Sequence, residues 1–315
     1  MTEDVDGTLQ DRGHILPAMP STAEQLIDQL PRTTWKERSY AHWVDIQLQA
    51  NDRWWQPLSS AIVGTVSTAM SAFLSLGFRK VVFEDMHKLT DIVEDPGRTR
   101  PVISVANHIS TMDDPLIWGA MPLRMRWNPE HMRWTLGAKE LLYKNPVLNM
   151  FFAYGQTIPT IRGAGIHQLG MEIALQRLRE NRWVHVFPEG KVNQDDSLLR
   201  LKWGVGRLIM ESDRVPIVVP MFHHGMKEVM PLRQKVPLPY PNPMKSVFYL
   251  KIGDAVDFTQ QVDEWKAARA KLTDPEEIAE LDERVRVQIT ARVRSAMDEL
   301  KTRCEAAISG GLLDA

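Results

Sequence analysis

The sequence predicts an α/β fold in which a largely parallel central sheet is flanked by helices, with an N-terminal helix that lies in a membrane interface. Four short apolar runs have the length of buried strands: residues 102–106, 183–187, 215–220 and 247–252. Apolar residues at helical spacing occur between these runs, near 165–181 and 199–210. Strands that alternate with helices indicate a parallel sheet covered on both faces. Residues 54–78 contain no charged side chain, and this run predicts the membrane helix.

Residues 1–50 are predicted to be an appended, partly disordered arm in which acidic side chains outnumber basic ones. Ser21 followed by Glu24 has the capping-box spacing and predicts a short helix that ends near Pro31. The first residues lack the basic start and apolar run of a secretory signal, and they are too acidic for a mitochondrial presequence. We therefore expect no simple cleaved targeting segment, and internal targeting stays open.

Residues 51–80 are predicted to be an amphipathic membrane-associating segment. It opens on Trp54 and Trp55 and closes on Arg79 and Lys80, which are residue types found at membrane interfaces. Most of its hydroxyl side chains fall on one helical side, and the other side carries Ile62, Val63, Val66, Ala69, Met70, Phe73 and Leu74. We expect this apolar side to enter the acyl region. A buried helix of a soluble protein and a full membrane span are the alternatives.

Residues 81–260 are predicted to form the catalytic domain, and residues 261–315 a C-terminal helical cover. Asp274 is a predicted helix cap with Pro275 in the first turn, and an apolar stripe continues from there to Cys304. Cys304 is the one cysteine, so a disulfide framework is excluded, and we expect it to be a small buried hydrophobe. The net charge of −2 and the absence of a basic block argue against nucleic acid as a partner.

The strand predicted at 102–106 leads directly into Asn107-His108 and, five residues after the histidine, Asp113. On one continuous helix His108 and Asp113 would be about 140° apart, so they meet only if the chain turns between them. An aspartate that accepts a hydrogen bond from one ring nitrogen orients a histidine as a general base. Ser110 is not surrounded by a nucleophile elbow, so the base would activate a substrate hydroxyl. Spacing alone also allows a polar loop with a helix cap.

Two further segments carry residue types that suit a phosphate or a close backbone approach. Phe187-Pro188-Glu189-Gly190-Lys191 follows a predicted strand; its glycine permits close approach, and its lysine is a phosphate ligand type. Arg162, in Thr157–Gly163, offers a bidentate fork for phosphate. Each signal is weak when taken alone.

Taken together and in this order, these segments resemble the glycerolipid acyltransferase superfamily, and longer blocks resemble its tafazzin family. The superfamily pattern is His-x4-Asp, then Arg-Gly, Phe-Pro-Glu-Gly and an apolar Val-Pro-Ile-Val-Val-Pro run. The blocks similar to tafazzins are 107–119, 183–193 and 201–209. The resemblance covers about residues 54–255, whereas the first 50 residues, the distal tail and Ile109-Ser110-Thr111 depart from it.

The resemblance implies a glycerolipid-acyltransferase-like fold and a coenzyme-A-independent phospholipid–lysophospholipid transacylase that remodels cardiolipin acyl chains, with His108 as general base and Asp113 orienting it. The implied partners are a membrane surface and phospholipid and lysophospholipid substrates such as cardiolipin and phosphatidylcholine. Monotopic attachment to the inner or outer mitochondrial membrane, facing the intermembrane space, is implied as well. No cofactor and no metal are expected, and the oligomeric state is left open. The implied substrate-binding residues are Arg162, Glu189, Gly190, Lys191 and Asn193.

Three other functions compete with this one. A coenzyme-A-dependent lysophospholipid or glycerol-3-phosphate acyltransferase would use the same base and orienter with a soluble acyl donor. A non-catalytic membrane scaffold would not need His108, Asp113, Glu189 and Gly190 to be intact. A metal hydrolase would need the histidines and aspartates to cluster, but their spacings match no zinc motif: His108, Asp113, Asp114, His185, His223 and His224.

Overall fold

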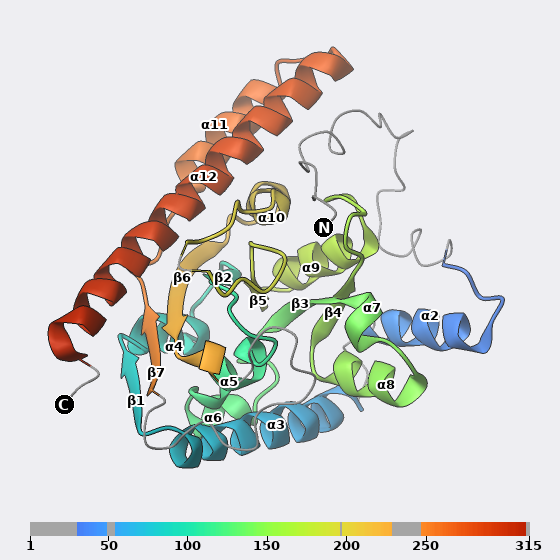
Figure 1. Ribbon diagram of the computed structural model, residues 1–315. Coiled ribbons are helices and arrows are strands. Elements are labelled where there is room, and N and C mark those ends of the chain that lie inside the picture. Colours follow the sequence, from blue (N-terminus) through green and yellow to red (C-terminus); the bar gives the residue numbers. More distant parts are fainter. Residues whose placement is uncertain (1–29, 49–53, 196, 229–246, 313–315) are drawn as a thin grey trace, which may run out of the picture.

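The strands of this computed structural model, which describes residues 30–48, 54–195, 197–228 and 247–312, form one sheet in the order β1-β7-β6-β2-β5-β3-β4 (Figure 1). Their bounds are β1 Lys80–Glu84, β2 Val102–Ala106, β3 Trp134–Ala138, β4 Thr157–Thr160, β5 Trp183–Val186, β6 Ile217–His224 and β7 Val247–Ile252. The strands β6, β2, β5, β3 and β4 are mutually parallel, and β7 pairs antiparallel with β6. The predicted, largely parallel sheet is therefore confirmed.

Helices cover both faces of the sheet. On one face the core lies under α3 Trp55–Gly77, α4 His87–Glu94, α5 Asp113–Gly119 and α6 Leu123–Arg126. The other face packs against α2 Trp35–Leu48, α8 Pro146–Tyr154, α9 Leu169–Arg179, α10 Gly204–Glu211 and α12 Pro275–Ala307. The short or peripheral elements are α7 Lys139–Leu142, η1 Met226–Glu228, α11 Thr259–Arg269 and η2 Ile308–Leu312. This arrangement leaves the carboxyl ends of the parallel strands at one edge, where α/β proteins commonly place their sites.

Helix α2 is part of the hydrophobic core, which the sequence analysis did not predict. Tyr40 and Val44 are buried in the larger core cluster. The side chain of Gln47 is fully buried and donates from Nε2 to the carbonyl of Thr157 at 2.6 Å. A polar residue on the buried side weakens the apolar periodicity, so the helix is hard to recognise from sequence. The helix expected after Ser21 lies outside the described residues.

Helix α3 occupies the predicted membrane segment, and it is the one helix in the described part of the chain that is long and apolar enough to span a membrane. Two of its hydroxyls bond to the protein: Ser59 Oγ donates to the carbonyl of Tyr154 at 2.8 Å, and Ser60 Oγ donates to that of Trp127 at 2.6 Å. Val63 and Leu74 are also buried, so the prediction that they face lipid is wrong. Close packing of α3 on α5 and α6 covers them.

The remaining predicted helices differ from the structure mainly at their ends. Helix α12 is unbroken, and the carboxylate of Asp274 accepts from the backbone N–H of Glu276 at 3.0 Å, as a cap does. Helix α10 begins at Gly204 and not near 199. The backbone N–H groups of Leu199 and Lys202 are bonded to Glu189 and to the carbonyl of Pro188, which holds this segment out of the helix.

Candidate active site

His108 and Asp113 meet at the carboxyl end of β2. The chain leaves the strand at Ala106, turns, and starts α5 at Asp113. His108 Nδ1 lies 2.9 Å from Asp113 Oδ2, which also accepts the backbone N–H groups of Ile109 at 2.7 Å and Ser110 at 2.8 Å. Three donors converge on one buried carboxylate oxygen, so Nδ1 carries the proton and Nε2 is left as the basic nitrogen.

The imidazole of His108 is held at the surface of the site by an aromatic ring. Its ring stacks on that of Phe187, with centroids 4.2 Å apart and an interplanar angle of 19°. The His108 side chain is 19% exposed, whereas that of Asp113 is fully buried. A base that faces outward and an orienter that faces inward are the arrangement that general-base catalysis requires.

The backbone of His108 is anchored on both sides by the segment after β5. Its N–H donates to Glu189 Oε1 at 2.9 Å, and its carbonyl accepts from the N–H of Asn193 at 2.6 Å. The other oxygen of Glu189 accepts from Leu199 N–H at 2.9 Å and from Asn193 Nδ2 at 3.2 Å. Both oxygens of this buried carboxylate are therefore occupied by donors from the protein.

Asn107 interlocks with His223 at the end of β6. Asn107 Nδ2 donates to the carbonyl of His223 at 2.9 Å, and Asn107 Oδ1 accepts from its N–H at 3.0 Å. His223 Nε2 lies 2.7 Å from the carbonyl of Asn107 and 3.7 Å from Asp113 Oδ2. Burial lowers the pKa of His223, so this ring is neutral and donates from Nε2. The side chain of Asn107 thus continues the β2–β6 pairing beyond the last strand residue.

A buried polar layer supports the site from below. Trp183 Nε1 donates to Ser104 Oγ at 2.7 Å, and the same oxygen lies 2.7 Å from His185 Nδ1. Burial lowers the pKa of His185 to about 3, so its ring is neutral. The ring of His185 contacts that of Phe187 edge-on, with centroids 4.5 Å apart. This layer fixes the aromatic ring on which His108 stacks.

The first turn of α5 is held by an ion pair. The guanidinium of Arg133 binds both oxygens of Asp114, and Trp118 Nε1 donates to Asp114 Oδ1 at 2.8 Å. Burial raises the pKa of Asp114, but the Arg133 charge and hydrogen bond outweigh it, and the net pKa is below the usual value. Asp114 therefore stays ionised and braces the helix that begins at Asp113.

The structure brings some predicted site residues together and leaves others apart. His108, Asp113, Glu189 and Asn193 form one hydrogen-bonded cluster. Gly190 is next to it with a φ of 71°, a left-handed conformation that favours glycine. The two predicted cationic ligands, Lys191 and Arg162, are both exposed on the surface.

Arg162 lies at the same edge of the sheet but on the far side of β3. It follows β4, which is separated from β2 by β5 and β3, or roughly 14 Å at the usual strand spacing. Its Nε is 3.4 Å from Glu140 Oε1. Its distance from His108 makes it suitable for the outer part of a large ligand and not for the reacting atoms.

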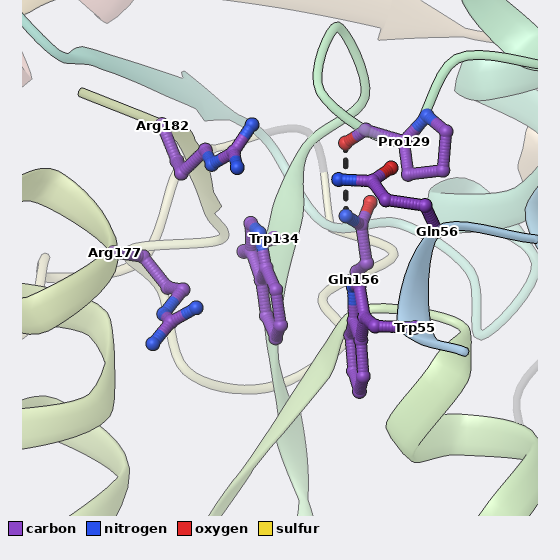
Figure 2. A pocket seen from close by; sticks show the side chains of 7 residues that line it. All are labelled: Trp55, Gln56, Pro129, Trp134, Gln156, Arg177 and Arg182. Carbon is purple, nitrogen blue, oxygen red and sulfur yellow. Dashed lines mark hydrogen bonds between the residues drawn. The ribbon is translucent and has the colours of Figure 1, made fainter. Parts of the chain in front are cut away.

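The described residues offer neither a metal centre nor an enclosed substrate cavity at the amino edge of the sheet. Within the ranges that the structure describes, no group of three or more His, Cys, Asp or Glu side chains is placed to hold a metal ion. A small enclosed cavity of about 10 Å³ lies at the opposite, amino edge of the sheet, between Trp55, Trp134 and Arg177 (Figure 2). It has room for about one water molecule and is not a substrate site.

Comparison with known proteins finds similar acyltransferases. The sequence matches the acyltransferase family over residues 80–223. It is 31% identical over 263 residues to tafazzin of Drosophila melanogaster, covering 84% of this chain and 66% of the fly protein. It is 40% identical over 204 residues to N-acylphosphatidylethanolamine synthase of Arabidopsis thaliana, covering 62% of this chain and 70% of the plant protein.

The chain belongs to the tafazzin family of acyltransferases. It spans just under two thirds of the fly tafazzin. A solved structure of the 1-acyl-sn-glycerophosphate acyltransferase of Thermotoga maritima is also similar, with 20% identity, a TM-score of 0.46, and coverage of 75% of this chain and 78% of that chain. The resemblance to the tafazzin family seen in the sequence is therefore confirmed, as is the acyltransferase class.

Proposed function

We propose that this protein is a coenzyme-A-independent transacylase that moves fatty acyl groups between phospholipids and lysophospholipids, with cardiolipin remodelling as its role. The observation that carries the proposal is the oriented pair His108–Asp113, with Nδ1 and Oδ2 2.9 Å apart, in a chain of the tafazzin family. No protein nucleophile accompanies this pair among the residues that form the described site. The pair therefore acts on a substrate hydroxyl directly.

In the proposed mechanism His108 Nε2 takes the proton from the free hydroxyl of a lysophospholipid. The hydroxyl oxygen attacks the ester carbonyl of a neighbouring phospholipid and forms a tetrahedral oxyanion. The new ester forms as the old carbon–oxygen bond breaks, and the proton on His108 passes to the departing glycerol oxygen. Because an ester replaces an ester, the equilibrium constant is near one and the reaction runs in both directions.

We assign the other predicted residues two different roles. Glu189 and Asn193 are positioning residues, because their side chains and backbone bind the His108 loop and one another. Gly190 keeps the backbone close beside the acceptor, and the exposed Lys191 and Arg162 contact lipid phosphates. The resemblance implies that Glu189 binds substrate. We assign it no headgroup contact, because both of its oxygens already have partners in the protein.

We propose monotopic attachment through α3 to a mitochondrial membrane, with the site facing the intermembrane space. Only 28% of the apolar 18-residue stretch of α3 is buried inside the protein, so much of the helix is available to lipid. The side that packs on the protein includes Ser59, Val63 and Leu74, and the exposed side includes Leu58 and Leu76. A helix with one face on protein and one apolar face outward suits the plane of an interface.

A second candidate function is transfer of the acyl group to an amine. The plant relative is an N-acylphosphatidylethanolamine synthase, and it is matched over 70% of its length. The same base would take a proton from the ethanolamine nitrogen, and an amide would form in place of an ester. Such a product is more stable than the donor ester, so this reaction would run in one direction.

The test is transfer of a labelled acyl group from phosphatidylcholine to lysocardiolipin in vesicles without coenzyme A. The wild-type protein transfers the label, and His108→Ala loses about 10²–10⁴-fold in rate because general-base catalysis is worth that much. His42→Ala, at an exposed position of α2, is the matched control and keeps the wild-type rate. Full activity in a folded His108→Ala protein contradicts the mechanism. Transfer only after acyl-coenzyme A is added moves the protein to the coenzyme-A-dependent class, and label on phosphatidylethanolamine supports the second candidate.

A further inference from the structure

Most of the large exposed apolar side chains in the described residues gather on neighbouring helices. Thirteen such side chains are exposed, and those outside this group are Trp35, Phe83 and Val287. The others lie on or next to α3, α6, α7, α8 and the end of β4: Trp54, Leu58, Leu76, Leu123, Trp127, Leu141, Val147, Met150, Phe151 and Ile161. Exposed apolar side chains that gather on neighbouring helices indicate a docking site.

Helix α8 carries the clearest apolar face apart from α3. Val147, Met150 and Phe151 are 69%, 39% and 37% exposed. Their spacing of three and four residues places them on one side of the helix. The opposite side is buried in the core through Asn149 and Ala153. The exposed apolar side chains of α8 therefore form one face of the helix and are not isolated positions.

This face is continuous with the proposed membrane helix. Helices α3 and α8 pack side by side: Ser59 of α3 donates to the carbonyl of Tyr154 of α8, and the Trp55 and Tyr154 rings are 5.1 Å apart. In Figure 1, α8 lies beside the first half of α3. Leu58, which precedes Ser59 in α3, is also exposed.

The charges around α8 fit an anionic lipid surface. Residues 145–161 contain no charged side chain, and the exposed Lys144 and Arg162 stand at either end of this run. An apolar stretch with cations at its borders is the pattern of a segment in a bilayer interface, where the cations meet lipid phosphates. A water-soluble protein partner would not require such a charge-free run.

The same surface reaches the edge of the sheet where His108 lies. Leu141 and Ile161 are 45% and 48% exposed. Leu141 lies three residues after the carboxyl end of β3, and Ile161 follows the last residue of β4. The contact between Arg162 and Glu140 shows that the two chain segments meet there. Since β2 is parallel to these strands, its carboxyl end with His108 is at the same edge.

We propose that α8, with Leu141 and Ile161, is a second membrane-binding surface that sets how the protein is rotated on the bilayer. A single helix in the interface leaves the protein free to turn about that helix. Insertion of Val147 and Phe151 beside α3 removes this freedom and brings the carboxyl edge of the sheet to the headgroups. The purpose of this second surface rests on the proposed function. The experiment that tests the surface does not, because it measures membrane binding and not transfer.

The test uses vesicles of phosphatidylcholine with an anionic phospholipid. Val147→Cys in a Cys304→Ala background is labelled with an environment-sensitive fluorophore, and Val287→Cys on α12 is the matched control. Val287 is 40% exposed, and its helix α12 lies on the other side of the sheet from α8 in the view of Figure 1. We expect a blue shift on vesicle binding at position 147 and none at 287. An unchanged spectrum at 147 in vesicle-bound protein overturns the proposal.

Charge insertion gives an independent measurement. Val147→Glu combined with Phe151→Glu should weaken vesicle binding roughly tenfold or more, because two apolar side chains are lost from the interface. Val287→Glu should leave binding unchanged. Transfer between detergent-solubilised lipids separates the two proposals: the double variant keeps its activity there if only docking is lost. If the wild-type protein transfers no label, the proposed function is refuted, and the result of the fluorophore experiment still holds. If the double variant binds vesicles as tightly as the wild type does, the second surface is refuted.

Discussion

The two carboxylates bound to the His108 loop have nearly opposite roles. Asp113 accepts from the imidazole ring itself as well as from two backbone N–H groups. Glu189 accepts from the backbone of His108 and from Leu199 and Asn193, and not from the imidazole ring. One carboxylate therefore sets the tautomer and electrostatics of the base, and the other sets where the base stands.

This comparison shows that buried acids in a motif need not contact substrate. Both carboxylates are buried, and both lie within seven residues of a strand end. What distinguishes them is the donors that converge on them. A carboxylate whose two oxygens are satisfied by backbone N–H groups is a structural anchor, because an additional ligand would have to displace those bonds.

The largest effect that separates the two roles is expected from Asp113→Asn. The backbone donors of Ile109 and Ser110 keep the amide oxygen in place of Oδ2, so the loop geometry survives. The negative charge that stabilises the imidazolium is lost, and the rate of transfer should fall about 10³-fold with little change in substrate affinity. Steady-state kinetics on vesicles measures the split between kcat and KM.

Asp114→Asn is the matched control for that variant, because Asp114 binds Arg133 and Trp118 and does not touch the ring of His108. It should lower thermal stability more than it lowers kcat. Nitrogen NMR of labelled histidine adds a direct readout: Asp113→Ala should lose the Nδ1-protonated signal assigned to His108. A wild-type rate in Asp113→Asn would show that the charge has no part in catalysis.

Glu189→Gln should have a smaller effect of another kind. The amide oxygen can still accept one N–H, but its NH₂ faces a second donor, so the His108 loop shifts. A displacement of this kind costs roughly tenfold to a hundredfold in kcat. Hydrogen exchange of the His108 and Leu199 amides should accelerate, whereas Asp113→Asn leaves the Leu199 amide protected.

Gly190→Ala would strain a different part of the same turn and serves as the comparison for Glu189→Gln. Gly190 has a φ of 71°, so alanine destabilises the turn without removing an anchor of His108. If Glu189→Gln raised KM and left amide exchange unchanged, Glu189 would be a substrate ligand, as the sequence first suggested.

The difference between the two carboxylates also explains which contacts of the site could be predicted from the sequence. The Asp113 contact is local: it follows from a five-residue spacing and the end of a strand. The contacts of Glu189 and His223 with the loop join residues 81 and 116 positions apart. They depend on β5 and β6 flanking β2, and the order of strands in a sheet is not written in the spacing of residues along the chain.

The same limit applies to the fold. Three strands were not predicted: β1 begins at Lys80 and ends at Glu84, β3 contains Gly137 and β4 contains Pro159. Proline is tolerated in β4 because that strand is at the edge of the sheet. On α3 the periodicity correctly gave a helix with two sides. It could not show that Val63 and Leu74 are covered by protein, since a core and a bilayer select the same residues.

The smallest predicted effect concerns the polar layer beneath the site. It is measured as the dependence of the free energy of unfolding on pH. Burial holds the pKa of His185 at about 3 in the folded protein, against 6.5 for an ordinary histidine. The unfolded chain therefore binds a proton that the folded chain does not, and stability falls as the pH drops from 6.5 towards 3.

His185→Gln removes this group. Between pH 6.5 and 5 the wild type should lose about 1–2 kcal/mol more than the variant in urea unfolding. His42→Gln, at an exposed position, should keep the wild-type slope. Equal slopes in the wild type and His185→Gln would mean that His185 titrates normally, and that the layer under Phe187 is open to water.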